Sequence, residues 1–375
     1  MENLPITNKA IYYQQDTNII GSTPRTSSTS PSSANPKACG KAFGVAEHLD
    51  VGSPAPKLVG IARLAQQSPR VRERTGVQYF SLPARSALNR ESSGRLPFAW
   101  TLNPYRGCEF GCKYCYARYT HEFMEMHDGL EFERKIFAKM GSPELLRAEL
   151  RRARDRGQPI ALGTATDPYQ PAEKQFRVTR DMLQVFSEFE GLDFSITTKS
   201  TLILRDLDLL VPLAGKHRLS VHITVTTVDT RLARLLEPKA PPPLKRLEAV
   251  RELAAAGIRT GVNAMPILPG LTDSPAHLDR LARVAAEHGA QFLHANVLFL
   301  MPSAMAQFMP FLEKDYPQLV RRYRKLYLRS AYLSSDYKDG ITRLAAEVRA
   351  RYGLTGKREE TTAAPLYRQY ALAFA

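Results

Sequence analysis

The stretch that decides the fold of this chain is Asn103-Pro-Tyr-Arg-Gly-Cys-Glu-Phe-Gly-Cys-Lys-Tyr-Cys-Tyr-Ala-Arg118, which we call the cysteine loop. It carries three of the four cysteines, Cys108, Cys112 and Cys115, in the spacing C-x3-C-x2-C. Glycines at positions 107 and 111 let the backbone turn with positive φ and approach an inorganic centre closely. Cysteine thiolates hold iron–sulfur clusters, and a [4Fe–4S] cube normally takes four of them. Three cysteines therefore predict a cluster with one iron left open to bind a small molecule.

Two other interpretations start from the same cysteines. A structural zinc site needs four nitrogen or sulfur ligands, so its fourth ligand would be His121 or His127. Buried, unreactive cysteines are the second alternative, although Arg106, Lys113 and Arg118 predict an electropositive setting that favours thiolates. Disulfides do not fit, because three clustered cysteines cannot all pair with one another.

The CxxxCxxC spacing, with Tyr114 just before the last cysteine, resembles the signature of the radical S-adenosylmethionine (SAM) superfamily. Together with Gly163-Thr-Ala-Thr-Asp-Pro-Tyr-Gln-Pro171, the cysteine loop resembles the spore photoproduct lyase-like branch, often labelled DNA-repair-photolyase-like. The resemblance implies a [4Fe–4S] cluster whose open iron binds the amino and carboxylate groups of SAM. It also implies an electron donor such as flavodoxin or ferredoxin. Reduction would then cleave SAM to methionine and a 5′-deoxyadenosyl radical, which abstracts hydrogen from a substrate.

The composition limits the class of protein. The chain has 375 residues, 43% of them hydrophobic, enough for one large α/β domain with extensions. Its net charge of +15 predicts steering of nucleic acid or an acidic substrate, unless the charges only solvate the surface. No apolar run is long enough to cross a membrane, and the start of the chain lacks signal-peptide features. We therefore expect a cytoplasmic protein without a membrane partner.

The chain divides into four segments by composition. Residues 1–75 are expected to be poorly ordered, because positions 21–36 are polar and rich in proline. Cys39 lies in this segment and is expected to be a free thiol rather than a cluster ligand. Residues 76–97 form a leading segment, residues 98–300 the radical SAM core, and residues 301–375 a helical C-terminal extension.

Strands and helices alternate in the pattern of residues 98–300. Six β/α units in series predict an α/β fold with a parallel sheet. Six units are too few for a closed eight-stranded barrel, so we expect a partial (β/α)6 barrel, with an open doubly wound sheet as the alternative. The expected strands are 98–102, 159–163, 194–198, 219–225, 259–267 and 291–300, and the expected helices are 142–155, 179–190, 202–210, 243–256 and 275–289.

Polar residues where the parallel strands end are candidates for cofactor binding, because sites in such folds gather there. By resemblance, Asp167 stands where the superfamily binds the SAM amino group, usually through Gly-Gly-Glu. Lys199 follows the third strand and can pair with the SAM carboxylate. The same residues also fit an Asp-Pro turn and ordinary strand positions. The other candidates are Thr164 and Thr166 beside Asp167, Thr224 and Thr226 for the ribose or carboxylate, Tyr114 for the adenine, and, more weakly, Asn263 and Asn296.

Tyr116 follows the last cluster cysteine and is a candidate catalytic residue, because a phenolic hydroxyl can relay a hydrogen atom. Spore photoproduct lyases also use a cysteine downstream of the cluster as hydrogen donor. This chain has no cysteine after Cys115. That departure argues against thymine-dimer repair and leaves the substrate open.

Residues 316–333 are expected to form an amphipathic helix that covers the open side of the barrel. Their basic and aromatic residues could instead contact nucleic acid. Two functions therefore compete with a radical SAM enzyme: a zinc-stabilised, basic nucleic-acid-binding protein without catalysis, and an electron carrier. The basic residues of this segment are Arg321, Arg322, Arg324, Lys325 and Arg329.

Overall fold

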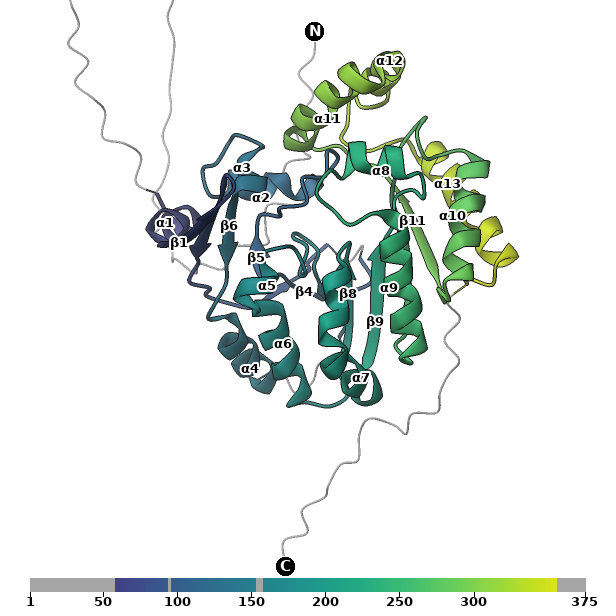
Figure 1. Cartoon of the computed structure of the whole chain (residues 1–375). Helices are drawn as coiled ribbons and strands as arrows, with labels where there is room; N and C mark the ends of the chain where they lie inside the picture. Colours follow the sequence, from purple (N-terminus) through teal and green to yellow (C-terminus); the bar gives the residue numbers. More distant parts are fainter. Residues whose placement is uncertain (1–57, 94–95, 153–157, 356–375) are drawn as a thin grey trace, which may run out of the picture.

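The computed structural model describes residues 58–93, 96–152 and 158–355. Its centre is a seven-stranded sheet in the order β11-β10-β9-β8-β7-β4-β3 (Figure 1). All neighbours in it are parallel except β3 and β4. The strands are β3 (Leu88–Arg90), β4 (Trp100–Leu102), β7 (Ile160–Leu162), β8 (Asp193–Thr198), β9 (Arg218–Thr224), β10 (Thr260–Ile267) and β11 (Leu293–Val297). The six parallel strands are the six predicted ones, so the expected partial barrel is confirmed, with β3 as an unpredicted antiparallel edge.

Helices follow one another around the outer face of this sheet (Figure 1). Alternate strand residues, such as Val221 and Ile223 of β9, are fully buried against them. The side chain of Ser274 caps the last of these helices by accepting a hydrogen bond from the backbone N–H of His277, 3.2 Å away. The helices are α4 (Ser142–Arg152), α6 (Val178–Ser187), α7 (Leu207–Lys216), α9 (Pro243–Ala255) and α10 (Pro275–Glu287).

One expected helix has different bounds. Residues 202–210 were predicted as a single helix, but the chain forms a 3₁₀ helix, η2 (Thr201–Asp206), which runs into α7. The Ser200 hydroxyl accepts a hydrogen bond from the backbone N–H of Leu202 at 3.2 Å and so starts the tighter turn. Short helices elsewhere are α2 (Tyr119–Glu122), α3 (Glu131–Arg134), α5 (Glu173–Phe176), α8 (Thr230–Leu236) and η1 (Tyr116–Arg118).

A second sheet lies beside the first and was not predicted. Its order is β1-β2-β6-β5, with β1 (Arg70–Arg74), β2 (Val77–Ser81), β6 (Lys135–Ala138) and β5 (Tyr105–Arg106). Ahead of it, α1 (Gly60–Gln67) packs Ala65 against Leu82 and Phe137. The expectation of poor order is therefore wrong for residues 60–74, because α1 packs on apolar residues later in the chain and β1 pairs with β2. Residues 1–57, including Cys39, lie outside the described residues.

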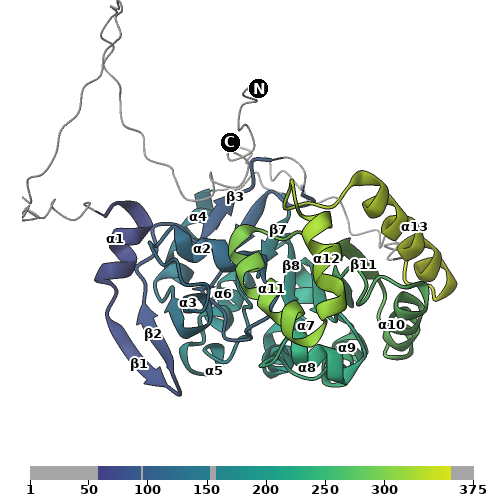
Figure 2. The same cartoon turned by 90° about the horizontal axis from the view of Figure 1, so that it is seen from above.

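The C-terminal part is helical as expected, with α11 (Pro302–Asp315), α12 (Pro317–Leu326) and α13 (Ser335–Arg351). The predicted helix over 316–333 ends at Leu326, because the following chain turns back to the end of β11. There Tyr327 donates a hydrogen bond to the Leu298 carbonyl at 2.8 Å, and the Leu300 N–H donates one to Ala331 at 2.8 Å. Figure 1 shows α11 and α12 at the top of the view, beyond the ends of the strands, and Figure 2 shows the same helices from above. No helix in the described ranges is long and apolar enough to cross a membrane.

Candidate active site

The cysteine loop follows β5 and is held between the two sheets. Gly107 and Gly111 have φ of +82° and +65°, as expected for tight turns. A Cβ at Gly107 would lie 2.7 Å from the carbonyl oxygen of Lys135, and a Cβ at Gly111 would lie 2.7 Å from Glu133 Oε2. Both glycines are therefore required by the close approach of the loop to residues 131–138.

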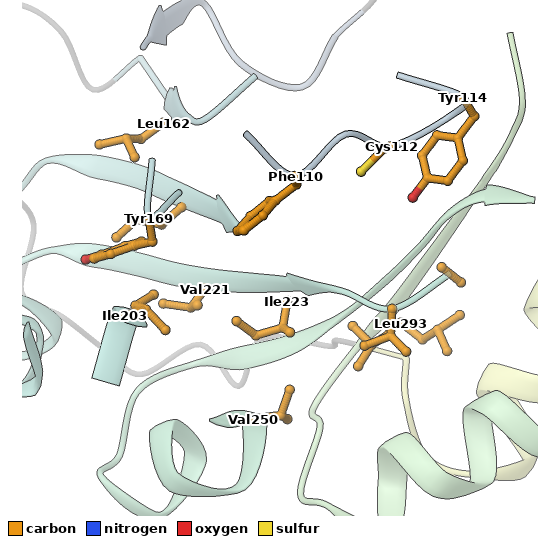
Figure 3. Packing of buried hydrophobic residues seen from close by; sticks show 14 of the residues in the cluster. Phe110, Cys112, Tyr114, Leu162, Tyr169, Ile203, Val221, Ile223, Val250 and Leu293 are labelled. Atoms are coloured by element: carbon orange, nitrogen blue, oxygen red, sulfur yellow. The ribbon is translucent and has the colours of Figure 1, made fainter. Parts of the chain in front are cut away.

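The three cysteines gather on this loop. Cys112 is buried, and Cys108 and Cys115 are half-buried. The Cys108 N–H donates to the Phe132 carbonyl at 2.9 Å, and the Cys115 N–H donates to the Cys112 carbonyl at 3.2 Å. Figure 3 shows Cys112 and Tyr114 near Phe110 of the same loop, within the apolar core that also contains Val221 and Ile223. Hydrogen bonds thus fix the backbone of the cysteine loop, and Cys108 and Cys115 are partly exposed.

The expected electropositive setting for the thiols is only partly present. Burial raises the pKa of Cys112 to about 12, and Lys199 opposes that shift. Burial, Asp167 and the neighbouring Cys112 raise the pKa of Cys108. Arg118 does not supply the expected free charge, because it forms a buried ion pair with Glu133 and donates to the Cys112 carbonyl at 2.9 Å. Without metal, the thiols of Cys108 and Cys112 therefore stay protonated, and the positive charge of a bound metal would be needed to deprotonate them.

A second loop, residues 163–171, braces the cysteine loop. Thr166 Oγ1 donates to the Gly107 carbonyl at 2.6 Å, and Gln170 Nε2 donates to the same oxygen at 3.0 Å. Gln170 Oε1 also accepts from the Glu109 N–H at 3.0 Å. Asn103 Nδ2 donates to Thr164 Oγ1 at 3.1 Å. Thr164 and Thr166, predicted to bind the cofactor, thus also hold the shape of the cysteine loop.

Asp167 and Lys199 meet where β7 and β8 end. Asp167 Oδ1 accepts from Thr198 Oγ1 at 2.6 Å and from the Tyr169 N–H at 2.9 Å, and Oδ2 accepts from the Lys199 N–H at 2.7 Å. Burial raises the pKa of Asp167 despite these donors. The Lys199 ammonium is 5.8 Å from the centre of the Tyr114 ring. Burial acts to lower the pKa of Lys199, but Cys112 and Glu237 outweigh it and the pKa is raised.

Behind the cysteine loop lies a buried network that the sequence did not predict. Glu237 and Arg246 form an ion pair at 2.6 Å with both side chains 1% exposed. Glu237 also accepts hydrogen bonds from Tyr114 and from Thr226, the latter at 3.0 Å. Arg246 donates to the Thr224 carbonyl at 3.1 Å. Tyr114, Thr224 and Thr226 are therefore brought together as a buried support for the loop, and their direct contact with a cofactor stays a prediction.

Tyr116 lies on the opposite side of the loop. Its hydroxyl donates to the Thr164 carbonyl, and its ring centre is 4.8 Å from that of Phe299. Helix α11 packs against η1, which begins at Tyr116. The predicted catalytic tyrosine is thus half-buried beside the cysteines, next to the chain that leaves β11.

The zinc alternative is not supported by the positions of its histidines. His121 is buried and its Nε2 lies 3.0 Å from the Lys135 carbonyl, and burial lowers its pKa to about 4. His127 is 71% exposed and pairs with Glu125 at 3.3 Å. In the described part of the chain, no three His, Cys, Asp or Glu side chains are grouped to hold a single metal ion. Three thiols on one glycine-shaped loop instead fit a cluster, in which each thiolate takes a different iron.

The other predicted residues lie apart from the cysteines. Asn263 and Asn296 are on β10 and β11, Asn263 paired across the sheet with Thr224. On α12, Arg322 pairs with Asp273 at 3.2 Å and Arg324 with Glu313 at 2.8 Å. The basic residues of this helix are therefore partly neutralised.

The fold and the cysteine loop define the class. A partial (β/α)6 barrel that carries CxxxCxxC after its first parallel strand is the arrangement of radical SAM enzymes. This chain belongs to the radical SAM superfamily, whose family model matches residues 102–282.

The chain is also similar to two other proteins and to a solved structure. The chain is 36% identical over 308 residues to a Mycobacterium tuberculosis protein described as uncharacterised, a match that covers 82% of this chain and 89% of that protein. A Methanocaldococcus jannaschii protein, also described as uncharacterised, is 27% identical over 219 residues, 58% of this chain and 77% of that protein. A spore photoproduct lyase variant with bound AdoMet and dinucleoside spore photoproduct has the same fold, with a TM-score of 0.53 and 15% identity over 70% of this chain and 76% of its own.

Proposed function

We propose that Cys108, Cys112 and Cys115 hold a [4Fe–4S] cluster whose remaining iron binds SAM. The observation that carries this proposal is the gathering of three thiols on one loop that two glycines and the second loop keep in shape. Such a cluster, reduced by a donor such as flavodoxin or ferredoxin, supplies the electron that splits SAM into methionine and a 5′-deoxyadenosyl radical.

The residues around the loop have separate roles in this proposal. Lys199 is the cation that faces the SAM carboxylate, because it is half-buried beside Cys112 and Tyr114. Asp167 uses three hydrogen bonds to fix the backbone that carries Lys199, so we assign it to positioning as well as to the SAM amino group. Tyr116 is the candidate for hydrogen-atom relay, because it follows the last cysteine and its hydroxyl is held by Thr164.

The cluster ligands are tested by single replacement. Cys108→Ala, Cys112→Ala and Cys115→Ala should each lose cluster binding after anaerobic reconstitution, whereas Cys39→Ala should keep it as the matched control. Iron and sulfide per chain and the brown absorbance are measured, together with 5′-deoxyadenosine formed from SAM and dithionite. Full iron content in any loop variant would refute the ligand assignment, and colourless protein with stoichiometric zinc would favour the non-catalytic alternative.

A further inference from the structure

The inner face of the sheet carries polar side chains where the outer face is apolar. On β9, Ser220 and His222 are half-buried, and they alternate with fully buried residues that pack on the helices. On β11, His294 and Asn296 alternate in the same way and are exposed. The cysteine loop and its support do not use these residues, so they need another explanation.

Two histidines on this face form a stack with an aromatic ring. The ring centres of His222 and His294 are 5.5 Å apart with planes 17° from parallel, and Phe292 lies 4.7 Å from His222 and 5.0 Å from His294. Phe292 can occupy this place because Gly261 has no side chain: a Cβ there would come within 2.4 Å of the Phe292 ring. His294 is the exposed end of the stack.

Hydrogen bonds fix the inner histidine. His222 Nδ1 lies 3.2 Å from Asn263 Oδ1, and Nε2 lies 3.1 Å from the Ser220 hydroxyl. Burial, followed by the nearby His294, lowers the pKa of His222 to about 4, so the ring is neutral at pH 7. Asn263, which is buried, pairs with His294 across the sheet, and Asn296 follows two positions after His294 on β11. The stack is therefore a rigid, uncharged platform with amides at its side.

Cations flank the platform. Arg259 lies with its guanidinium carbon 5.1 Å from the Phe292 ring centre. Helix α13, which carries Arg349, packs against β11, the strand of His294. Burial, and then Arg349 and Arg259, lower the pKa of His294. Stacking rings bordered by arginines are the arrangement that binds the bases and phosphates of single-stranded nucleic acid.

We propose that His294, the exposed end of the stack, binds one nucleobase of the substrate through the face of its ring and that Arg349 binds the phosphate, while the buried Phe292 and the half-buried His222 hold the His294 ring in place. This inference rests on the proposed radical SAM function and names the substrate class for that site. His294 and Phe299, which contacts Tyr116, are five positions apart in the sequence, so at most about 18 Å of extended chain joins them.

The test compares an oligonucleotide that has bases with one that lacks them and carries the same number of phosphates. Reconstituted protein saturated with SAM is titrated anaerobically with fluorescein-labelled dT6 and with an abasic hexamer of equal phosphate number, and unlabelled thymidine is used as a competitor. Wild-type protein should prefer dT6, and His294→Ala should reduce that preference by about 5- to 150-fold, the range for loss of one stacked base. His294→Phe should restore it, and His127→Ala, which removes an exposed imidazole elsewhere, should leave it unchanged.

The phosphate contact has its own control on the same helix. Arg349→Ala should weaken dT6 and the abasic hexamer equally and reduce the salt dependence by about one contact, whereas Arg343→Ala should not. If thymidine competes at a concentration similar to that of dT6, the ligand is a free nucleoside. That result would overturn the phosphate part of the proposal. Equal affinity of wild-type protein for both hexamers, or an unchanged preference in His294→Ala, would overturn the base site. In that case, cleavage of SAM in the absence of substrate would still be measured. That measurement would decide the proposed function independently of the base site.

Discussion

At the scale of residues, the candidate site combines side chains that are close together in the sequence with side chains that are far apart in it. The cysteines and their glycines could be predicted, because spacing within one loop is a local property. The Glu237–Arg246 pair could not, because Glu237 is 123 positions from Tyr114 and nothing near it in the sequence marks a buried carboxylate. Asp167 was a candidate because of its place after a strand, but its three hydrogen bonds depend on how β7 and β8 meet.

Lys199 allows a prediction at this scale. Lys199→Ala should keep the cluster but weaken SAM binding by about ten-fold or more, because a half-buried cation that pairs with a carboxylate would be lost. Isothermal titration of SAM into the reconstituted protein measures it, with iron content as the check on the cluster. Lys216→Ala, at the end of α7, is the matched control. Unchanged SAM affinity in Lys199→Ala would assign the carboxylate to another group.

At the scale of elements, the contacts of the second loop, residues 163–171, explain why polar side chains stand there. The run from Gly163 to Pro171 resembles the spore photoproduct lyase-like branch. In the structure it supports the cysteine loop, since Thr166 and Gln170 donate hydrogen bonds to the carbonyl of Gly107. The helices and parallel strands were predictable from their periodicity and caps. The second sheet was not, because β5 and β6 are short and find each other only after the cysteine loop has folded back.

Gln170 tests this bracing. It is fully buried, so Gln170→Ala leaves the Glu109 N–H without its acceptor. We expect a loss of about 1–3 kcal/mol in the free energy of unfolding and faster loss of iron on dilution into chelator. Urea unfolding and the rate of bleaching measure the two effects. Gln184→Ala on the exposed face of α6 is the control, and equal behaviour of the two variants would contradict the bracing role.

At the scale of the whole molecule, the charge of +15 is not gathered in one helix. On α12, which was the sequence-based candidate for nucleic-acid contact, Arg322 and Arg324 have acidic partners. Arg321 and Lys325 are exposed on the same helix. Exposed ion pairs contribute little to stability, but they reduce the charge that is free to meet phosphate. The charge that α12 leaves free to meet phosphate is therefore smaller than the sequence suggested.

Salt dependence measures how much of α12 touches nucleic acid. Replacing Arg321 and Lys325 together by alanine should lower the slope of log affinity against log salt for dT12 by about 1.4, two single-strand contacts' worth. Arg324→Ala should lower it less, because Glu313 already holds that side chain. Fluorescence anisotropy over a salt series gives the slopes. Identical slopes for wild-type protein and the double variant would remove α12 from the interface.

The open sheet described above has a consequence for how the protein behaves at high concentration. A sheet that does not close into a barrel has two edges, and an unpaired edge is a template on which another chain can add a strand and aggregate. Here β3 at one edge is three residues long and ends in Arg90. At the other edge, the chain after α13 pairs Thr355 with Phe292, and the Leu293 N–H donates to Leu354 at 3.2 Å. Both edges of the seven-stranded sheet are thus too short or too occupied to recruit a neighbouring chain.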